Sequence, residues 1–132
     1  MKQTILFAVL LLPLSFPLFC RASTAQIDGN DLLEKCRPFW VDTGTPLTLN
    51  NTERLNMGYC AGYVSGVMDV EAVWNATEKG VSKATHYCIP KEANNGQVLR
   101  ILKKWLDDNP AKLHWRADTI IHHALVEAFP CK

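Results

Sequence analysis

The sequence predicts an all-α fold, a small disulfide-stapled bundle of about four helices, and three observations favour this class. Apolar residues recur at steps of three and four in several stretches, which is the period of a helix with one buried face. No stretch alternates apolar and polar residues as a half-buried strand does. Four cysteines follow the N-terminal segment in a chain of 132 residues, and an even number is typical of disulfides in an exported domain.

The first 25 residues have the features of a secretory signal peptide. Met1-Lys2 supplies a positive start, Ile5–Phe19 is apolar, and Ser23 and Ala25 offer small residues for cleavage. The apolar run is too short and too interrupted by prolines to span a membrane. We therefore expect export from the cytoplasm, no membrane association after cleavage, and a mature helical domain of residues 26–132.

The charge of the mature domain gives no reason to expect nucleic acid or an anionic membrane as a partner. The chain has 14 basic and 13 acidic residues, and removal of Lys2 and Arg21 leaves 12 against 13, a formal charge of −1. The mature cysteines are Cys36, Cys60, Cys88 and Cys131. Four cysteines allow three connectivities, between which spacing alone does not choose.

A short first helix is expected over residues 32–40, LLEKCRPFW. Asp31 can cap its N-terminus, with Glu34 in the capping-box position. Pro38 is expected to end it early, because proline lacks an amide hydrogen and crowds the preceding turn. Its inward face is predicted to hold Leu32, Leu33, Cys36 and Phe39. Residues 41–50 contain glycine and proline and predict a loop.

The longest helix is predicted from Asn50 to Trp74, as the central element of the fold. Asn50 is a suitable cap, with Glu53 three residues later. One face carries Tyr59, Tyr63, Val67, Val70 and Trp74, and another carries Gly58, Gly62, Ser65 and Gly66. Glycine costs a helix interior up to about 1 kcal/mol relative to alanine. We therefore expect close neighbours at the glycines, and neighbours on several sides of this helix.

The remaining elements are a long loop and two further helices. Gly80–Gly96 has no sustained period and predicts an irregular connection tied down by a disulfide at Cys88. A third helix is expected from about Gly96 to Asp108, ended by Asn109-Pro110. The last helix, Leu113–Ala128, has the clearest period. Its apolar face holds Leu113, Ala117, Ile120, Ile121, Ala124, Leu125 and Ala128.

The polar residues do not combine into a catalytic or metal site. His122 and His123 are adjacent on a helix and point about 100° apart, and the cysteines contain no C-x-x-C spacing. Asp69 and Glu71 are two apart on a helix and also diverge. No serine lies in a nucleophile-elbow context, and disulfide-bonded cysteines are not nucleophiles. We expect no enzymatic activity, no metal and no cofactor.

Four segments in order carry a resemblance to a known family. They are Cys60-Ala61-Gly62-Tyr63-Val64-Ser65-Gly66, Tyr87-Cys88-Ile89-Pro90, Gln97 to Asn109-Pro110, and Ala124-Leu125 to Phe129-Pro130-Cys131. Their order and spacing resemble the immunity proteins of the Rap/Tai family. These are exported α-helical proteins that protect bacteria from type VI secretion amidase effectors. The resemblance runs from about Cys36 to Cys131.

This resemblance implies a periplasmic immunity protein that binds and inhibits a type VI secretion peptidoglycan amidase effector and so protects the producing cell. It also implies a homodimer, for which the small-residue face of the long helix offers one place. The pairing it implies is Cys36–Cys60 and Cys88–Cys131. The first disulfide would join the two leading helices, and the second would tie the long loop to the end of the chain.

Two other classes of function remain open from the sequence. A small disulfide-bonded periplasmic stress chaperone or envelope structural factor would expose apolar surface, for instance after acid-induced monomerisation. A small hydrolase would turn over peptidoglycan in a soluble assay.

The effector is expected to contact the loop of residues 80–96 and the start of the third helix, since rigid scaffolds often carry function on long connections. The polar residues offered there are Lys83, His86, Lys91, Glu92, Asn94 and Asn95. The alternative surface is the exposed side of the last helix around Arg116, Thr119 and His123.

Overall fold

The computed structural model describes residues 26–41, 49–77 and 86–131. Its helices are α1 (Gly29–Trp40), α2 (Asn51–Thr77), α3 (Asn95–Asp108), the 3-10 turn η2 (Pro110–Lys112) and α4 (Ala117–Ala128). Extended pairing within these ranges is confined to two isolated bridges, Asp28–Arg116 and Tyr87–Pro130. The prediction of a small four-helix, all-α fold is confirmed. The predicted signal peptide, residues 1–25, lies outside the described residues.

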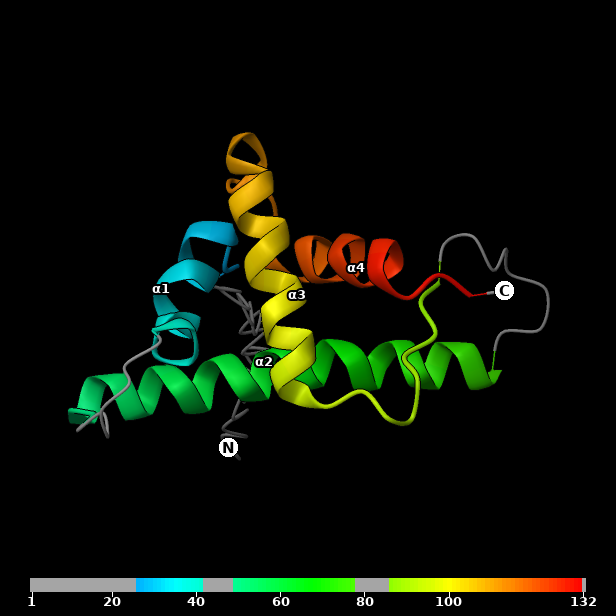
Figure 1. Cartoon of the computed structure of the whole chain (residues 1–132), viewed down its shortest axis with the longest axis horizontal. Coiled ribbons are helices and arrows are strands. Elements are labelled where there is room, and N and C mark those ends of the chain that lie inside the picture. The colour runs from blue at the N-terminus through cyan, green and yellow to red at the C-terminus, as the bar shows by residue number, and fades with distance from the viewer. Residues whose placement is uncertain (1–25, 42–48, 78–85, 132) are drawn as a thin grey trace, which may run out of the picture.

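The long helix α2 forms one side of the molecule, and α1 and α4 pack against it (Figure 1). α1 packs mainly on α2, while α3 packs mainly on α4 and also touches α1. In the ranges described, no helix combines the length and apolar content that crossing a membrane requires.

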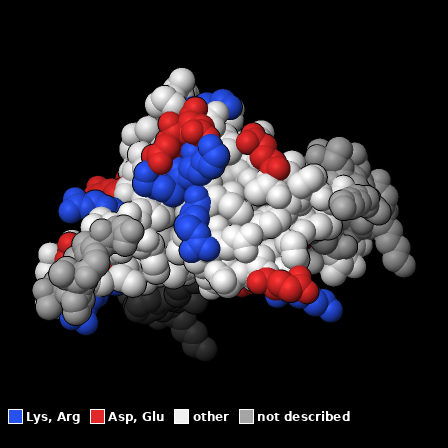
Figure 2. All heavy atoms as spheres, in the orientation of Figure 1, with Lys and Arg blue, Asp and Glu red and all other residues white. Residues whose placement is uncertain are grey.

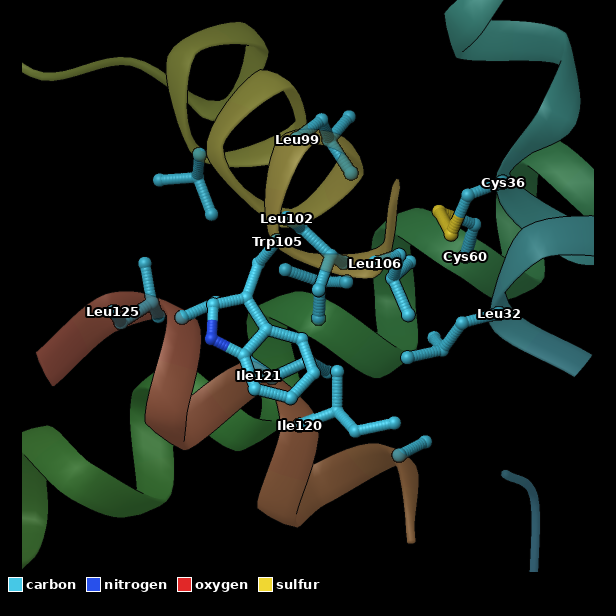
Figure 3. Close-up of a cluster of buried hydrophobic side chains, with 14 of the residues drawn as sticks. Leu32, Cys36, Cys60, Leu99, Leu102, Trp105, Leu106, Ile120, Ile121 and Leu125 are labelled. Atoms are coloured by element: carbon cyan, nitrogen blue, oxygen red, sulfur yellow. A yellow bond between two sulfur atoms is a disulfide. The ribbon is translucent and has the colours of Figure 1, made fainter. Parts of the chain in front are cut away.

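The core lies where α3, α4 and α1 meet over the middle of α2 (Figure 3). The buried residues of α3 and α4 include Val98, Leu99, Leu102, Trp105, Leu106, Ala117, Ile120, Ile121, Ala124 and Leu125. Leu32 enters from α1, and Val64 from α2. Each fully buried large side chain contributes roughly 1.5–3 kcal/mol relative to exposure. This cluster fixes how the surface segments are placed.

Both disulfides implied by the family resemblance are present. Cys36–Cys60 joins α1 to α2, and Cys88–Cys131 joins the segment before α3 to the end of the chain. They connect residues 24 and 43 positions apart. The chain-entropy argument gives about 3.5 and about 4 kcal/mol of stabilisation for loops of these lengths.

α1 begins three residues earlier than predicted and does not end at its proline. Asp28, rather than Asp31, is the cap and accepts hydrogen bonds from the amides of Asn30 and Asp31 at 2.8 and 3.0 Å. In return, the Asp28 amide donates to the Asp31 carboxylate at 3.0 Å. Pro38 lies in the last turn, where it removes little of the hydrogen-bond ladder, so the early end predicted there is wrong. Of the predicted inward residues Leu32, Leu33, Cys36 and Phe39, only Leu32 and Cys36 are buried, while Leu33 is half-buried and Phe39 is exposed.

Gly29, at the start of α1, sits against the segment that precedes α4. Its amide donates to the carbonyls of Leu113 and Trp115, at 2.8 and 3.2 Å. A methyl group on Gly29 would lie 2.7 Å from the side chain of Ile120 and 2.8 Å from the Leu113 carbonyl oxygen. The close approach therefore requires glycine at this position.

The cap of α2 is confirmed, but the predicted packing of this helix is wrong. Asn50 accepts from the Glu53 amide at 2.9 Å, and Glu53 accepts from the Asn50 amide at 2.8 Å. The fully buried positions are Cys60 and Val64, whereas Trp74, on the predicted apolar face, is 53% exposed. At the predicted close-contact glycines Gly58, Gly62 and Gly66, no described residue comes within 4 Å of a methyl group built there. Among the described residues, the helices that pack on α2 are α1 and α4, and both lie on the same side of it.

The last two helices follow the prediction closely, although both begin at a different residue from the one predicted. α3 starts one residue early, at Asn95, and is capped by Asn94. α4 starts at Ala117 rather than at Leu113, because η2 and an extended residue at Arg116 occupy the intervening chain. The predicted apolar face of α4 is otherwise buried from Ala117 to Leu125.

Candidate partner-binding surface

The described part of the predicted loop is residues 86–96, of which 95 and 96 belong to α3, and it is anchored to the scaffold at its start. Lys83 lies outside the described residues. The Nδ1 atom of His86 is 2.5 Å from Oε1 of Glu71 on α2, and these two side chains are only 12% and 13% exposed. His86 is therefore engaged in an internal contact.

Glu71 links three elements of the fold. Its second oxygen lies 3.8 Å from Nδ1 of His122 on α4. The ring of Tyr87 packs 5.7 Å from the ring of His122. Burial, with a smaller effect of the Glu71 carboxylate, raises the pKa of Tyr87 well above its usual range. The sequence predicts Asp69 and Glu71 only as two diverging carboxylates. It does not predict the contacts of Glu71 with the two histidines, because these lie far from it in the chain.

The next residues present open side chains. Lys91 and Glu92 form an exposed turn, and Asn95 is exposed in the first turn of α3. Asn94 is different, because its side chain accepts a hydrogen bond from the Gln97 amide at 2.9 Å and caps α3. The predicted set thus divides into open residues, Lys91, Glu92 and Asn95, and residues with a structural contact, His86 and Asn94.

The alternative surface on α4 consists of residues that mostly contact one another. Nε of Arg116 donates to Asp118 at 3.0 Å, and Asp118 also accepts from the Thr119 amide at 2.7 Å. These hydrogen bonds, above all the one from Arg116, lower the pKa of the Asp118 carboxyl. The ring of His123 stacks on Trp105, with 6.3 Å between the ring centroids.

A groove of about 650 Å³ runs between α2 and α4. Gly62, Tyr63, Gly66, Val67, Val70 and Glu71 line it from α2, and Asp118, Thr119 and His122 line it from α4. It is mostly apolar. The groove therefore joins the surface of α2 around Gly62 and Gly66 to the surface of α4.

The side of α2 that the described residues leave uncovered carries one continuous apolar stripe. We define the α2 stripe as Leu55, Tyr59, Gly62, Gly66, Val70 and Val73, with Trp74 at its edge. These positions recur at steps of three and four and so share one face of the helix. Val70 is 58% exposed, and the other large members are exposed too. A single exposed apolar side chain is ordinary, but a continuous set marks an interaction surface.

Charged side chains gather elsewhere. Figure 2 shows Lys and Arg side chains over α3 next to a group of Asp and Glu side chains. Lys103 and Asp107, and Lys104 and Asp108, form ion pairs one helical turn apart. Exposed pairs of this kind contribute little to stability, typically below about 1 kcal/mol.

The described residues supply no evident reaction centre. They contain no group of three or more His, Cys, Asp or Glu side chains placed to hold a metal ion. The four cysteines of residues 26–131 are all in disulfides, so none is available as a thiolate nucleophile. What the arrangement offers is a stapled scaffold with two kinds of contact surface, one polar and one apolar.

Comparison with known proteins yields one match. The family model of the Rap1a immunity proteins matches residues 28–131. Neither the curated proteins nor the solved structures include a match to this chain.

Proposed function

The chain belongs to the Rap1a immunity protein family, and we propose that it binds and inhibits a peptidoglycan amidase effector of type VI secretion in the periplasm. The family match over residues 28–131 carries the proposal, since the family implies binding of a toxin effector. The amidase class rests on the sequence resemblance described above. The predicted signal peptide of residues 1–25 supports export, and two disulfides suit an oxidising compartment.

Inhibition by occlusion requires a rigid surface and no reacting group. The core and the Cys88–Cys131 disulfide hold the segment 86–94 against α2 and the chain end. Lys91, Glu92 and Asn95 are thereby presented with little ordering left to complete on binding, which favours affinity. We place the effector contact on this segment and on the first turn of α3.

Co-expression tests the function directly. A periplasm-directed amidase from the neighbouring gene should lyse cells that lack this protein and spare cells that make it. A matched control is the same chain without residues 1–25, which should not protect, since it stays apart from the effector. Lysis in the presence of the full chain would contradict the proposal.

The contact surface is tested by the triple variant Lys91→Ala, Glu92→Ala, Asn95→Ala. Asn94 is left unchanged because it caps α3. The helical content and the melting temperature should stay nearly unchanged, since substitutions at exposed positions usually shift the free energy of unfolding by less than about 0.5 kcal/mol. Affinity for the effector, measured by calorimetry, should fall at least tenfold, or about 1.4 kcal/mol. A matched control is Glu34→Ala with Arg37→Ala, two exposed positions on α1. Unchanged binding by the triple variant would move the contact to the surface of Arg116, Thr119 and His123.

We further propose that the protein is a homodimer through the α2 stripe. Two copies crossing at Gly62 and Gly66 would bring their helix backbones close, and Val70 and Val73 would be removed from water. A two-fold contact places the same patch on both subunits, which one apolar stripe satisfies. Val70→Glu should convert the dimer to a monomer in sedimentation analysis and leave the circular dichroism spectrum unchanged. A wild-type protein that sediments as a monomer at all concentrations would contradict the dimer.

The exposed α2 stripe also suits the second candidate, a periplasmic chaperone that holds unfolded clients on apolar surface. The two functions differ in specificity. A chaperone would suppress aggregation of an unrelated, thermally unfolding protein, and Val70→Glu would weaken that effect. An immunity protein would leave the aggregation unchanged and protect against one effector only.

A further inference from the structure

We propose that the Cys88–Cys131 disulfide is a site of thiol–disulfide exchange, whereas the Cys36–Cys60 disulfide is closed to it. The two disulfides lie in very different surroundings. Cys36 and Cys60 are both 0% exposed, and they join two packed helices at the edge of the core (Figure 3). Cys88 is exposed and Cys131 is half-buried.

Access decides the rate of exchange, because the attacking thiolate must reach a sulfur atom directly. For Cys36–Cys60 a reagent would have to separate α1 from α2 at Leu32 and Val64, which means opening the core. Cys88 and Cys131 both lie outside the helices, in chain that precedes α3 and follows α4. No core contact has to break before a reagent arrives there.

The exchange needs a dithiol as co-reactant. One thiolate of the dithiol bonds to the sulfur of Cys88, the more exposed partner, and the bond to Cys131 breaks with Cys131 leaving as a thiolate. The second thiol of the reagent, as thiolate, then attacks the mixed disulfide and releases Cys88. Two electrons pass to the protein, which becomes a dithiol, and the reagent becomes a cyclic disulfide.

Local contacts keep the opened ends close to each other. The Cys88 amide donates to the Phe129 carbonyl at 2.8 Å, and Tyr87 and Pro130 form a bridge. The Phe129 amide still donates to the Leu125 carbonyl at 2.8 Å, so the end of α4 is held independently of the disulfide. Reduction should therefore loosen residues 86–94 and 129–131 while the core and the other disulfide persist.

Loosening this segment has a consequence for binding, and this part rests on the proposed function. Lys91 and Glu92 follow Cys88 by three and four residues. Without the covalent tie they would have to be ordered by the effector, which costs affinity. The redox state of Cys88–Cys131 would thus set the strength of inhibition.

The experiment is graded reduction of the native protein with dithiothreitol at pH 8, followed by iodoacetamide and peptide mass analysis. Cys88 and Cys131 should become alkylated at least tenfold faster than Cys36 and Cys60, which should react at a comparable rate only in denaturing urea. The circular dichroism spectrum of the selectively reduced protein should keep its helical signal. Equal rates, the reverse order, or unfolding upon the first reduction would overturn the proposal.

A second variant separates the two disulfides. In Cys88→Ser with Cys131→Ser, the remaining disulfide should stay as resistant to dithiothreitol as in the wild-type protein. If it becomes readily reducible, its resistance is not due to burial, and the proposal fails. Effector affinity of the reduced and alkylated protein should be at least tenfold weaker. Unchanged affinity would overturn the claim that the redox state of Cys88–Cys131 sets the strength of inhibition. The mass analysis tests the selective exchange of this disulfide independently of the effector.

Discussion

The same substitution, glycine to alanine, should have opposite effects at two positions of this fold. Gly62 lies in the middle of α2, and no atom of the described ranges is within 4 Å of a methyl group built on it. Gly29 lies at the start of α1, where the same methyl group would meet three atoms at 2.7 to 2.9 Å. The pair therefore tests the packing of the fold with a single chemical change.

At Gly62 the change should stabilise the protein. Glycine in a helix interior costs roughly 0.5–1 kcal/mol relative to alanine, mainly because the unfolded chain has more freedom. No steric term offsets this gain, because the site is open. The free energy of unfolding of the monomer should rise by about 0.5–1 kcal/mol, and the melting temperature by about 4–8 °C per kcal/mol for a domain of this size.

At Gly29 the change should destabilise the protein. Two of the three close atoms belong to the backbone of Leu113, and Gly29 is itself hydrogen-bonded to that carbonyl, so neither side can move away freely. Inserting a methyl group into a packed contact typically costs about 1–3 kcal/mol. The two variants should therefore differ by about 1.5–4 kcal/mol.

Urea unfolding followed by circular dichroism measures both variants, and a dilution series separates monomer from dimer. At low concentration the Gly62→Ala monomer should be more stable than the wild-type monomer. At high concentration the gain should shrink or reverse, because the added methyl group would hold two α2 stripes apart. A destabilised Gly62→Ala monomer, or a stable Gly29→Ala variant, would refute the packing described here.

Three further predictions concern single side chains. Asn94→Ala should destabilise the protein by about 1 kcal/mol in urea unfolding, because α3 loses its cap. Glu71→Gln should cost about 1–3 kcal/mol and speed amide hydrogen exchange at Cys88, since both histidine contacts of the carboxylate are weakened. Asp118→Asn should make stability less sensitive to acid. The pKa of Asp118 is lowered in the fold, chiefly by Arg116, so its contribution is present above the unfolded pKa and lost as the pH falls through the folded value. Urea unfolding at pH 7 and pH 3 measures the difference, and an unchanged difference would contradict this role.

The sequence predicted those parts of the fold whose signals are local. The reciprocal bonds of Asn50 and Glu53 follow from two residues three positions apart. The buried face of α4 from Ala117 to Leu125 follows from the spacing of its apolar residues. A helix with a single buried side has apolar residues at steps of three and four, and this spacing is visible in the sequence. The start of α4 was missed, because the bridge between Asp28 and Arg116 joins chain segments far apart in sequence.

The candidate surface could be predicted only in part, for the same reason. Exposure of the turn at Lys91 and Glu92 follows from polarity and the neighbouring proline. The engagement of His86 does not, since its partner Glu71 belongs to another element. The cap role of Asn94 has a local signal, an asparagine directly before a helix, but a third helix that begins at Gly96 does not predict it.

α2 carries more apolar surface than the described residues cover. Its apolar residues extend around much of the helix, which is why the predicted face, centred on Tyr63 and Val67, fell between the buried side and the exposed one. A helix that is apolar on two sides needs two neighbours. The described fold supplies one of them, at Cys60 and Val64. The α2 stripe, on the opposite side, has no neighbour among the described residues, and the second copy in the proposed dimer would supply one.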